Sequence, residues 1–252
     1  IRSGDGRTNK YDVEAGNNTY DNAVIENSKI SEKNKIQNNQ SMLDDIMNST
    51  QYPKQLKDLA LKNEEALEFV YDYPTEHVKE HTIDLTKEAS MDSVPLFVQW
   101  DKRWGYEKYS GNFFAASGCG PTTLSMVVVY LTHNREASPI AVAKYSKEAG
   151  YSVDGSGSSW TLISEGCMHY GVKAKAVALD ESRMKAELDE GHPIVVNVGP
   201  GDFTDTGHFM VITGYDDEGF SINDPNSIEK SGKRWLFKNI SSQIRAVWSM
   251  YV

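Results

Sequence analysis

The sequence has only two cysteines, Cys119 and Cys167, among 252 residues, and it has no apolar run of transmembrane length. Two cysteines do not make a metal site of the common structural kinds, which take four ligands drawn mostly from cysteine and histidine. The pair could form one disulfide, unless one of the two must stay free to react. The chain is therefore expected to hold no metal centre and no membrane-spanning segment.

Basic residues are also scarce, because 26 Lys and Arg stand against 36 Asp and Glu and leave a net charge of −10. Nucleic acids and anionic membrane surfaces repel an acidic protein, so neither is expected as a partner. The length allows one large domain, or one domain with an extension. The first residue is Ile1 and no signal-like apolar segment follows, so we expect a processed or shortened form that has lost any export signal.

Large apolar residues are rare in residues 1–40, which are rich in Asn, Ser, Lys, Asp and Gly. Ile25, Ile30 and Ile36 stand almost alone there, and so few apolar side chains cannot offset the entropy lost on ordering the chain. We expect residues 1–40 to be a disordered tether or linker. A solvated, Asn-rich tether ahead of a folded domain is typical of a secreted or cell-envelope protein, and we expect that location.

Residues 41–83 are expected to form a helical N-terminal arm. Apolar residues recur at helical spacing in two stretches, Met42 to Met47 and Leu56 to Val70. Pro53 lies near the start of the second stretch, and Tyr73-Pro74 marks its end. We interpret the arm as a helical pair packed on the main domain. The alternative is a pro-segment or an arm that gates access for substrate.

One cysteine lies in a segment that predicts a reactive thiol. The stretch Ser117-Gly118-Cys119-Gly120-Pro121-Thr122-Thr123 runs into the apolar run 124–131, and Pro121 suits the first turn of a helix. The N-terminus of a helix carries the positive end of its dipole, which favours the nucleophilic thiolate. The alternative is a small buried residue at a helix start, because free cysteines are often buried. A base and an orienting group downstream would favour the reactive thiol.

Residues 84–252 should form one domain in which helices come first and strands later, and this order predicts an α+β fold with an antiparallel sheet. Helices are expected after Cys119, after Ser138, and over 160–170 and 184–188, and a flexible loop over Asp154–Ser158. The expected strands are 94–100, 172–179, 193–198, 208–215, 220–225, 234–237 and 246–252. Cys167 falls on the apolar pattern of its helix and is expected in the core.

The candidate catalytic residues are Gln99, Cys119, His208 and Asp224, in this chain order. A cysteine nucleophile needs a histidine as base and a second group to fix the tautomer of that histidine. His208 opens a strand after a Gly-rich loop, and Asp224 ends the next strand. Gln99 could donate an amide N–H to the oxyanion of acyl transfer, or could simply bond to the backbone. His192 is the rival base, but it precedes a proline at a strand start.

The geometry of the expected hairpin raises one difficulty for this set. A hairpin with its turn at 217–218 would place Asp224 opposite Val211, roughly 10 Å from His208 along the strand. A bulge, a strong twist or a break at the Asp-Pro bond must close that gap. Otherwise Asn223 or another residue would orient the histidine.

The motifs SGCGPTT, GHFMVITGYDD and INDPNS, preceded by a glutamine, resemble those of papain-like cysteine peptidases. The resemblance is to relatives of the bacteriocin-leader (double-glycine) processing family, closest to stand-alone exported members from Gram-positive bacteria, and it covers about Val94 to Val252. It implies a papain-like fold in which an N-terminal helical lobe carries the nucleophile and packs on the sheet. It also implies that Cys119 is the nucleophile, His208 the base, Asp224 the orienting residue and Gln99 the oxyanion donor.

The expected activity is hydrolysis of a peptide or amide bond through a thioester on Cys119, without a metal or cofactor. The expected partner is a peptide or protein substrate, including a peptide of the cell envelope, and we expect a monomer. One alternative is transfer of the acyl group to an amine, as in transglutaminase-like enzymes. Another is a module that binds peptides or cell wall and has kept the cleft without turnover.

Overall fold

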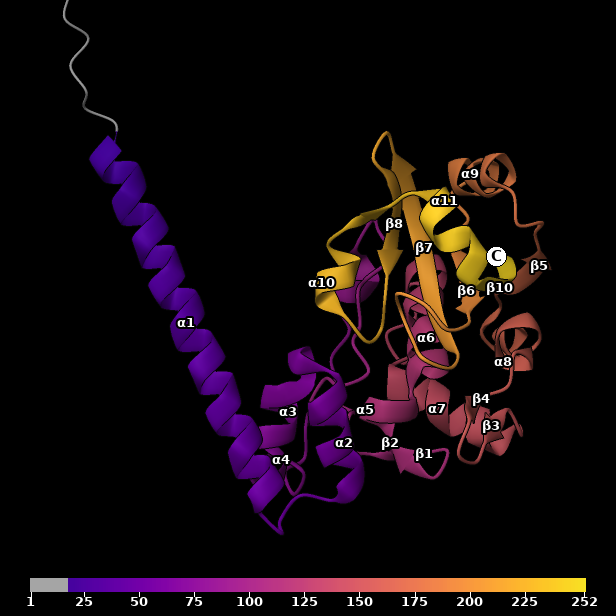
Figure 1. Ribbon diagram of the computed structural model, residues 1–252. Coiled ribbons are helices and arrows are strands. Elements are labelled where there is room, and N and C mark those ends of the chain that lie inside the picture. Colours follow the sequence, from indigo (N-terminus) through magenta and orange to yellow (C-terminus); the bar gives the residue numbers. More distant parts are fainter. Residues whose placement is uncertain (1–17) are drawn as a thin grey trace, which may run out of the picture.

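The computed structural model of the protein describes residues 18–252, which form a long N-terminal helix, a helical arm and a mixed domain (Figure 1). The long helix, α1 (Asn18–Asn48), projects away from the rest, and only its C-terminal end packs on the arm. Across residues 18–252, no helix is both long and apolar enough to cross a membrane.

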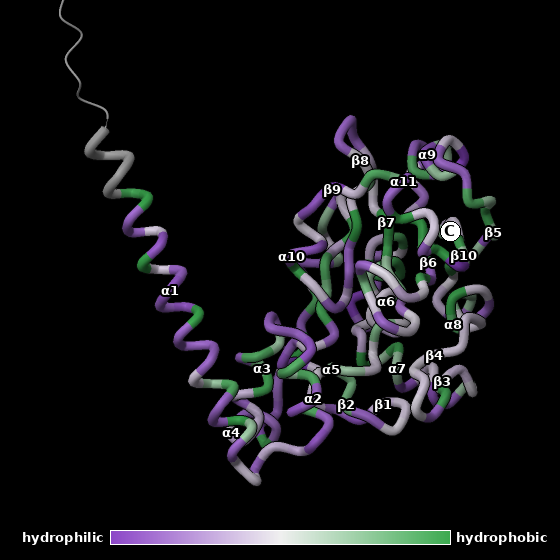
Figure 2. The backbone as a smooth tube through the Cα atoms, in the orientation of Figure 1, coloured by the Kyte–Doolittle hydropathy of each residue, from purple (hydrophilic) through white to green (hydrophobic). Residues whose placement is uncertain are grey.

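The prediction of a disordered linker over residues 1–40 is wrong for residues 18–40, which belong to α1. No glycine or proline interrupts residues 18–48, so the helix can extend N-terminally from the end that packs on the arm. The side chains are nevertheless solvated: α1 is mostly hydrophilic, and Val24, Ile30 and Ile36 are exposed (Figure 2). The remainder of that prediction, residues 1–17, lies outside the described residues.

The arm contains four short helical segments where the sequence pattern predicts one long helix up to Val70. These are α2 (Lys54–Lys62), η1 (Glu64–Ala66), α3 (Leu67–Tyr71) and α4 (Tyr73–Glu76). Asn63 breaks the pattern because its backbone is extended, with φ −136° and ψ 99°, and its side chain accepts a hydrogen bond from the Glu65 N–H. It therefore ends α2 and caps the next turn.

The arm packs on the main domain through one apolar cluster. The arm contributes Ile46, Leu56, Leu59, Ala60, Ala66, Leu67, Phe69 and Val70, and the domain contributes Phe113 and Ala115. Phe69 also stacks on Tyr106, with ring centroids 4.2 Å apart. A Cβ at Gly105 would lie 2.7 Å from the Phe69 ring, so only glycine permits this close approach.

The main domain is built on a six-stranded antiparallel sheet with the order β5-β10-β6-β7-β8-β9. The strands are β1 (Lys108–Tyr109), β2 (Asn112–Phe113), β3 (Ser152–Val153), β4 (Gly157–Ser158), β5 (Lys173–Ala176), β6 (Ile194–Val198), β7 (His208–Asp216), β8 (Gly219–Asn223), β9 (Arg234–Trp235) and β10 (Ile244–Tyr251). The helices are η2 (Glu88–Ser90), α5 (Phe114–Ser117), α6 (Cys119–Thr132), α7 (Pro139–Glu148), α8 (Thr161–Ser164), η3 (Gly166–Tyr170), α9 (Glu181–Asp189), α10 (Ile228–Ser231), α11 (Phe237–Ile240) and η4 (Ser241–Gln243).

Helices cover both faces of this sheet, because its central strands are apolar on both sides. Val195, Phe209 and Val211 face the larger core, together with α6, α7 and α8. Alternate residues of the same strands, such as Val196 and Met210, face a second core closed by α9 and α11. In Figure 1, α6 lies behind the sheet. The predicted α+β class is confirmed, with Cys119 on the helical side and an antiparallel sheet beside it.

Two local predictions are wrong. The segment 94–100 is not a strand, because no strand within residues 18–252 pairs with it. It is held as a loop by the buried Phe97 and by a hydrogen bond from the Gln99 N–H to the Pro225 carbonyl (2.7 Å). The segment Asp154–Ser158 is not simply a flexible loop, because its end pairs with residues 152–153 to form the β3–β4 hairpin.

Candidate active site

Cys119 is the first residue of α6, as predicted from the Cys-Gly-Pro sequence. Gly118 precedes the helix, and the next two turns of α6 are buried in the larger core. Thr123 ties this helix to β7 through a hydrogen bond from Oγ1 to the Phe209 carbonyl (3.1 Å). A Cβ at Gly120 would lie 2.5 Å from the Ser158 Oγ, so this glycine lets the β3–β4 hairpin pass directly beside the cysteine.

His208 and Asp224 form a buried, charge-assisted pair. The Asp224 Oδ1 lies 2.7 Å from the His208 Nε2, and the two residues are 0% and 6% exposed, respectively. The same Asp224 oxygen also accepts the Asn226 N–H at 2.8 Å. Because Nε2 is engaged by the carboxylate, Nδ1 is the ring nitrogen left for the thiol.

A β-bulge closes the gap that the regular hairpin would leave. The pairing shifts between Ile212 and Gly214, so that Thr213 has no partner residue on β8 and Asn223 pairs with Val211. Asp224 therefore lies level with residue 210, one residue nearer to His208 than in a regular ladder. The shift also moves the Asp224 side chain to the opposite face of the sheet from the one it would occupy in a regular ladder, because side chains alternate between the two faces along a strand. The carboxylate thus comes to the face that His208 shares.

The thiol and the imidazole change each other's protonation. Enclosure of the Cys119 thiol by protein opposes its ionisation. The hydrogen bond and charge of His208, with the backbone N–H groups of Phe209 and Gly120, nevertheless lower its pKa below that of an ordinary cysteine thiol. Burial opposes the charged form of His208, but the Asp224 carboxylate and the Cys119 thiol raise its pKa well above the ordinary 6.5. Both shifts favour the thiolate–imidazolium pair.

Gln99 lies in the same pocket as Cys119 and His208. Its Nε2 donates to the Ala115 carbonyl at 2.7 Å, which fixes the orientation of the amide, and the side chain is only 4% exposed. Its backbone N–H donates a hydrogen bond to the carbonyl oxygen of Pro225, the residue after Asp224 (2.7 Å). The structure therefore brings together all four residues that the sequence singled out.

The other candidates lie elsewhere. His192, the rival base, is paired with Glu187, with 3.3 Å from Nδ1 to the Glu187 Oε2, and does not line the cleft around Cys119. Cys167 is fully buried in the larger core, as predicted, and burial raises its pKa to about 11. The two thiols therefore differ sharply in their tendency to ionise.

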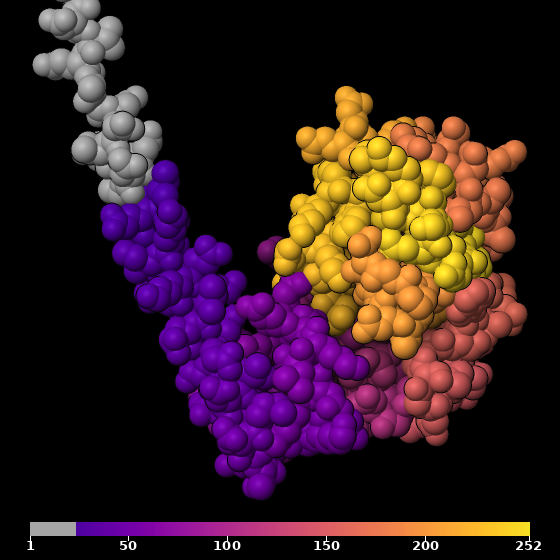
Figure 3. Space-filling model, viewed as in Figure 1, coloured from indigo at the N-terminus to yellow at the C-terminus, as the bar shows by residue number. Residues whose placement is uncertain are grey.

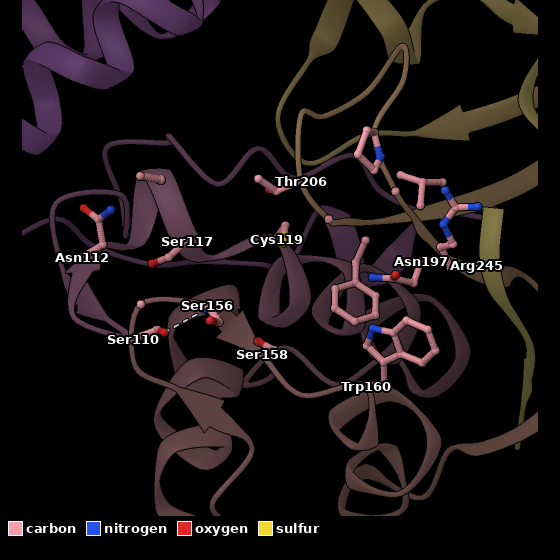
Figure 4. Close-up of a pocket in the computed structure, with 18 of the residues that line it drawn as sticks. Ser110, Asn112, Ser117, Cys119, Ser156, Ser158, Trp160, Asn197, Thr206 and Arg245 are labelled. Atoms are coloured by element: carbon pink, nitrogen blue, oxygen red, sulfur yellow. Dashed lines mark hydrogen bonds between the residues drawn. The ribbon is translucent and has the colours of Figure 1, made fainter. Parts of the chain in front are cut away.

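The cleft extends to both sides of Cys119. On one side a cavity of about 700 Å³ is lined by the β3–β4 hairpin, Trp160, Asn197 and Arg245, and Figure 4 shows these residues around Cys119. On the other side a cavity of about 490 Å³ lies between α2 and the 201–207 loop. Residues of the loops 154–159 and 199–207 therefore both line the cleft.

Sequence reasoning missed the contribution of the arm to this cleft. Asp58, Lys62 and Asn63 line the second cavity together with Gln99 and His208. In the sequence Asn63 falls on the apolar face of an amphipathic helix, whereas Asp58 and Lys62 look like its solvated face. Nothing in their spacing shows that this face turns towards a cysteine more than 50 positions away.

Comparison with known families agrees with this arrangement. Residues 91–252, which include all four candidate residues, match the Peptidase_C39 like family. The chain belongs to this family. The resemblance stated from the motifs is therefore confirmed at the level of the family, and a Peptidase_C39 like member has the fold of a cysteine peptidase. The arm lies outside the matched residues.

Two solved structures are distant likenesses of this Peptidase_C39 like chain. The peptidase domain of Streptococcus ComA, a bi-functional ABC transporter involved in quorum sensing, is 20% identical; the match covers 54% of this chain and 90% of that one, with a TM-score of 0.42. A protein described as a C39-like peptidase from Bacillus anthracis is 18% identical over 63% of this chain and 95% of that one, with a TM-score of 0.39. No curated protein matches the chain.

Proposed function

We propose that the protein is a cysteine peptidase that cleaves a peptide or amide bond through a thioester on Cys119. The observation that carries the proposal is the 2.7 Å contact between the His208 Nε2 and the Asp224 Oδ1 beside a thiol of lowered pKa. This contact holds the imidazole so that its other nitrogen faces the Cys119 thiol, and a histidine so placed can shuttle a proton.

The reaction begins with attack of the Cys119 thiolate on the substrate carbonyl carbon, and the carbonyl π electrons move to oxygen. The tetrahedral intermediate collapses as the His208 Nδ1 donates its proton to the leaving amine, and the C–N bond breaks. Now neutral, His208 accepts a proton from water, which attacks the thioester. Collapse of the second intermediate releases the carboxylic acid and regenerates the thiolate–imidazolium pair. Asp224 keeps the imidazole in one orientation throughout.

The oxyanion would be stabilised by two donors at the start of α6. The Cys119 backbone N–H lies in the first turn, where N–H groups have no partner within the helix. Gln99 would supply the second donor: its Nε2 carries two hydrogens, and the bond to Ala115 uses one. The fixed amide would need no reorganisation during the reaction.

The decisive experiment measures the rate of Cys119 alkylation by iodoacetamide against pH, with mass spectrometry to separate Cys119 from Cys167. In the wild-type protein we expect Cys119 to react at a pH well below that of an ordinary thiol, whose pKa is about 8.5, and we expect His208→Ala to abolish this shift. If Cys119 instead titrates like an ordinary thiol and ignores the substitution, the peptidase proposal is wrong.

A second experiment identifies the reaction and tests the proposed substrate class. We propose peptides of the cell envelope, a choice that rests on the Asn-rich N-terminal segment, so the peptide library should include cell-wall peptides. Hydrolysis incorporates oxygen from labelled water into the new carboxyl group. Product release that depends on an added amine, without that incorporation, would instead indicate acyl transfer.

A further inference from the structure

The carboxylate of Glu65, on the arm, is engaged by the segment that follows Asp224. Its Oε2 accepts the backbone N–H groups of Ile228 (2.7 Å) and Glu229 (3.1 Å), and its Oε1 accepts the Ser227 hydroxyl. Among the described residues no Lys, Arg or His forms an ion pair with it. All the hydrogen bonds of this carboxylate therefore go to residues 227–229.

The segment 224–231 is a compact turn that places Asp224. The Ser231 Oγ accepts the Asp224 N–H (2.9 Å) and donates to the Ser227 carbonyl (2.7 Å). The Asn226 N–H donates to the Asp224 Oδ1, the same oxygen that binds His208. A displacement of this turn would consequently move the carboxylate relative to the imidazole.

Asn63 makes a second bond from the arm to the same turn. Its Nδ2 donates to the carbonyl oxygen of Asn226 (2.9 Å) and to its side-chain oxygen (3.0 Å). Trp100, from the main domain, donates to the same carbonyl at 3.2 Å. Asn63 and Glu65 are two residues apart, and the first caps the turn that carries the second, so they form one rigid contact surface.

The arm is also fixed to the other side of the cleft. Its apolar cluster includes Phe113 of β2 and Ala115 of α5, the two elements that come before the Cys119 helix. The Tyr106 hydroxyl also donates a hydrogen bond to the Phe69 carbonyl at 2.7 Å. The arm thus contacts the segment leading to the thiol and the turn that carries Asp224. Figure 3 shows the purple arm meeting both the magenta and the gold parts of the molecule on this face.

We propose that the arm is a working part of the active site, in which Asn63 and Glu65 are positioning residues that hold the Asp224 turn against His208. This inference rests on the proposed peptidase function and extends it to residues outside the matched family region. It contradicts the interpretation of the arm as a removable pro-segment, because removing the arm would release the turn. Neither residue takes part in the chemistry, since both act through Asp224.

The test compares three single variants by the pH dependence of Cys119 alkylation with iodoacetamide. Glu65→Gln removes the charge that holds the turn. Asn63→Asp keeps an oxygen that caps the arm, but it replaces the N–H donor to the turn by an acceptor and adds a negative charge that faces the two Asn226 oxygens. Glu64→Gln is the matched control, because this exposed neighbour contacts Asn39 of α1 and not the turn. Cys167 in the same samples reports any general loosening of the core.

We expect Glu65→Gln and Asn63→Asp each to raise the apparent pKa of Cys119 by about one unit, which is about a tenfold slower alkylation at pH values below that pKa. Glu64→Gln should match the wild type, and Cys167 should stay unreactive in all four proteins. If Cys119 keeps its low pKa in both Glu65→Gln and Asn63→Asp, the inference is wrong while the peptidase proposal stands. If the wild-type thiol itself titrates normally, both are wrong.

Discussion

Replacing Asp224 by asparagine isolates the contribution of its charge. The Asp224 Oδ1 accepts hydrogen bonds from both His208 and Asn226, whereas its Oδ2 is buried and has no hydrogen-bond partner among residues 18–252. An asparagine can therefore place its oxygen at the Oδ1 position and its NH₂ at the Oδ2 position without changing shape. The hydrogen bond to His208 survives, but its acceptor becomes neutral.

The size of the effect follows from that change of acceptor. A hydrogen bond to a charged group contributes about 1.5–3 kcal/mol, against about 1 kcal/mol for a neutral one. The thiolate–imidazolium pair should thus lose roughly 0.5–2 kcal/mol, which centres on about one pKa unit at 1.36 kcal/mol per unit. The pKa of His208 should fall and that of Cys119 should rise by comparable amounts.

The assay is the alkylation rate of Cys119 from pH 4 to 10, with peptide hydrolysis measured alongside. Asp224→Asn should shift the acid limb of both profiles upward by about one unit, so that hydrolysis is about tenfold slower at any pH on that limb. Asp216→Asn is the control: it makes the same change on the same hairpin, at an exposed carboxylate paired with Arg234. Profiles of Asp224→Asn that coincide with the wild type would refute the orienting role of this carboxylate.

Three further outcomes are expected. Gln99→Ala should lower kcat about 10²–10³-fold, as loss of an oxyanion donor does, with little change in the alkylation profile of Cys119; a normal kcat would exclude the oxyanion role. Gly120→Ala should lower the free energy of unfolding, measured in urea, by about 1–3 kcal/mol, because its methyl group would lie 2.5 Å from the Ser158 Oγ of β4. Gly214→Ala is the control and should cost less, because no atom lies within 4 Å of its Cβ position. In Cys119→Ala, Asp224 still raises the pKa of His208, so protonation of His208 favours the folded state. The unfolding free energy should therefore be highest below about pH 6.5, the unfolded-state pKa, and should fall as the pH rises through the folded-state pKa. A second substitution, His208→Asn, should remove that decline.

The sequence predicted the parts of the fold that depend on neighbouring residues. The start of α6 followed from the Cys-Gly-Pro order, and α7 followed from Ser138, whose side chain accepts the Ala141 N–H as a helix cap. The candidate site followed from motifs, since the residues carrying the chemistry lie beside recognisable turn and strand signals. These features need no knowledge of distant contacts.

The features that were missed depend on contacts between distant segments. Residues 18–40 continue a helix, α1, of which only the C-terminal end packs on the rest of the protein, and their polar composition gave no sign of that packing. The break at Asn63 looks like an ordinary helical position until its bonds to Asn226, 163 residues away, are known. Likewise, the segment 94–100 has the composition of a strand but no strand to pair with. Single-sequence patterns do not contain these contacts.

The bulge at Thr213 has a consequence for recognising relatives of this protein. The extra residue is absorbed at one point of the ladder, so the pairing on either side of it is regular. A chain with one residue fewer there could align the same strands and bring the same two side chains together. The separation of 16 positions between His208 and Asp224 is therefore not required for the two side chains to meet. A search that demands this spacing would discard chains whose hairpin builds the identical pair without a bulge.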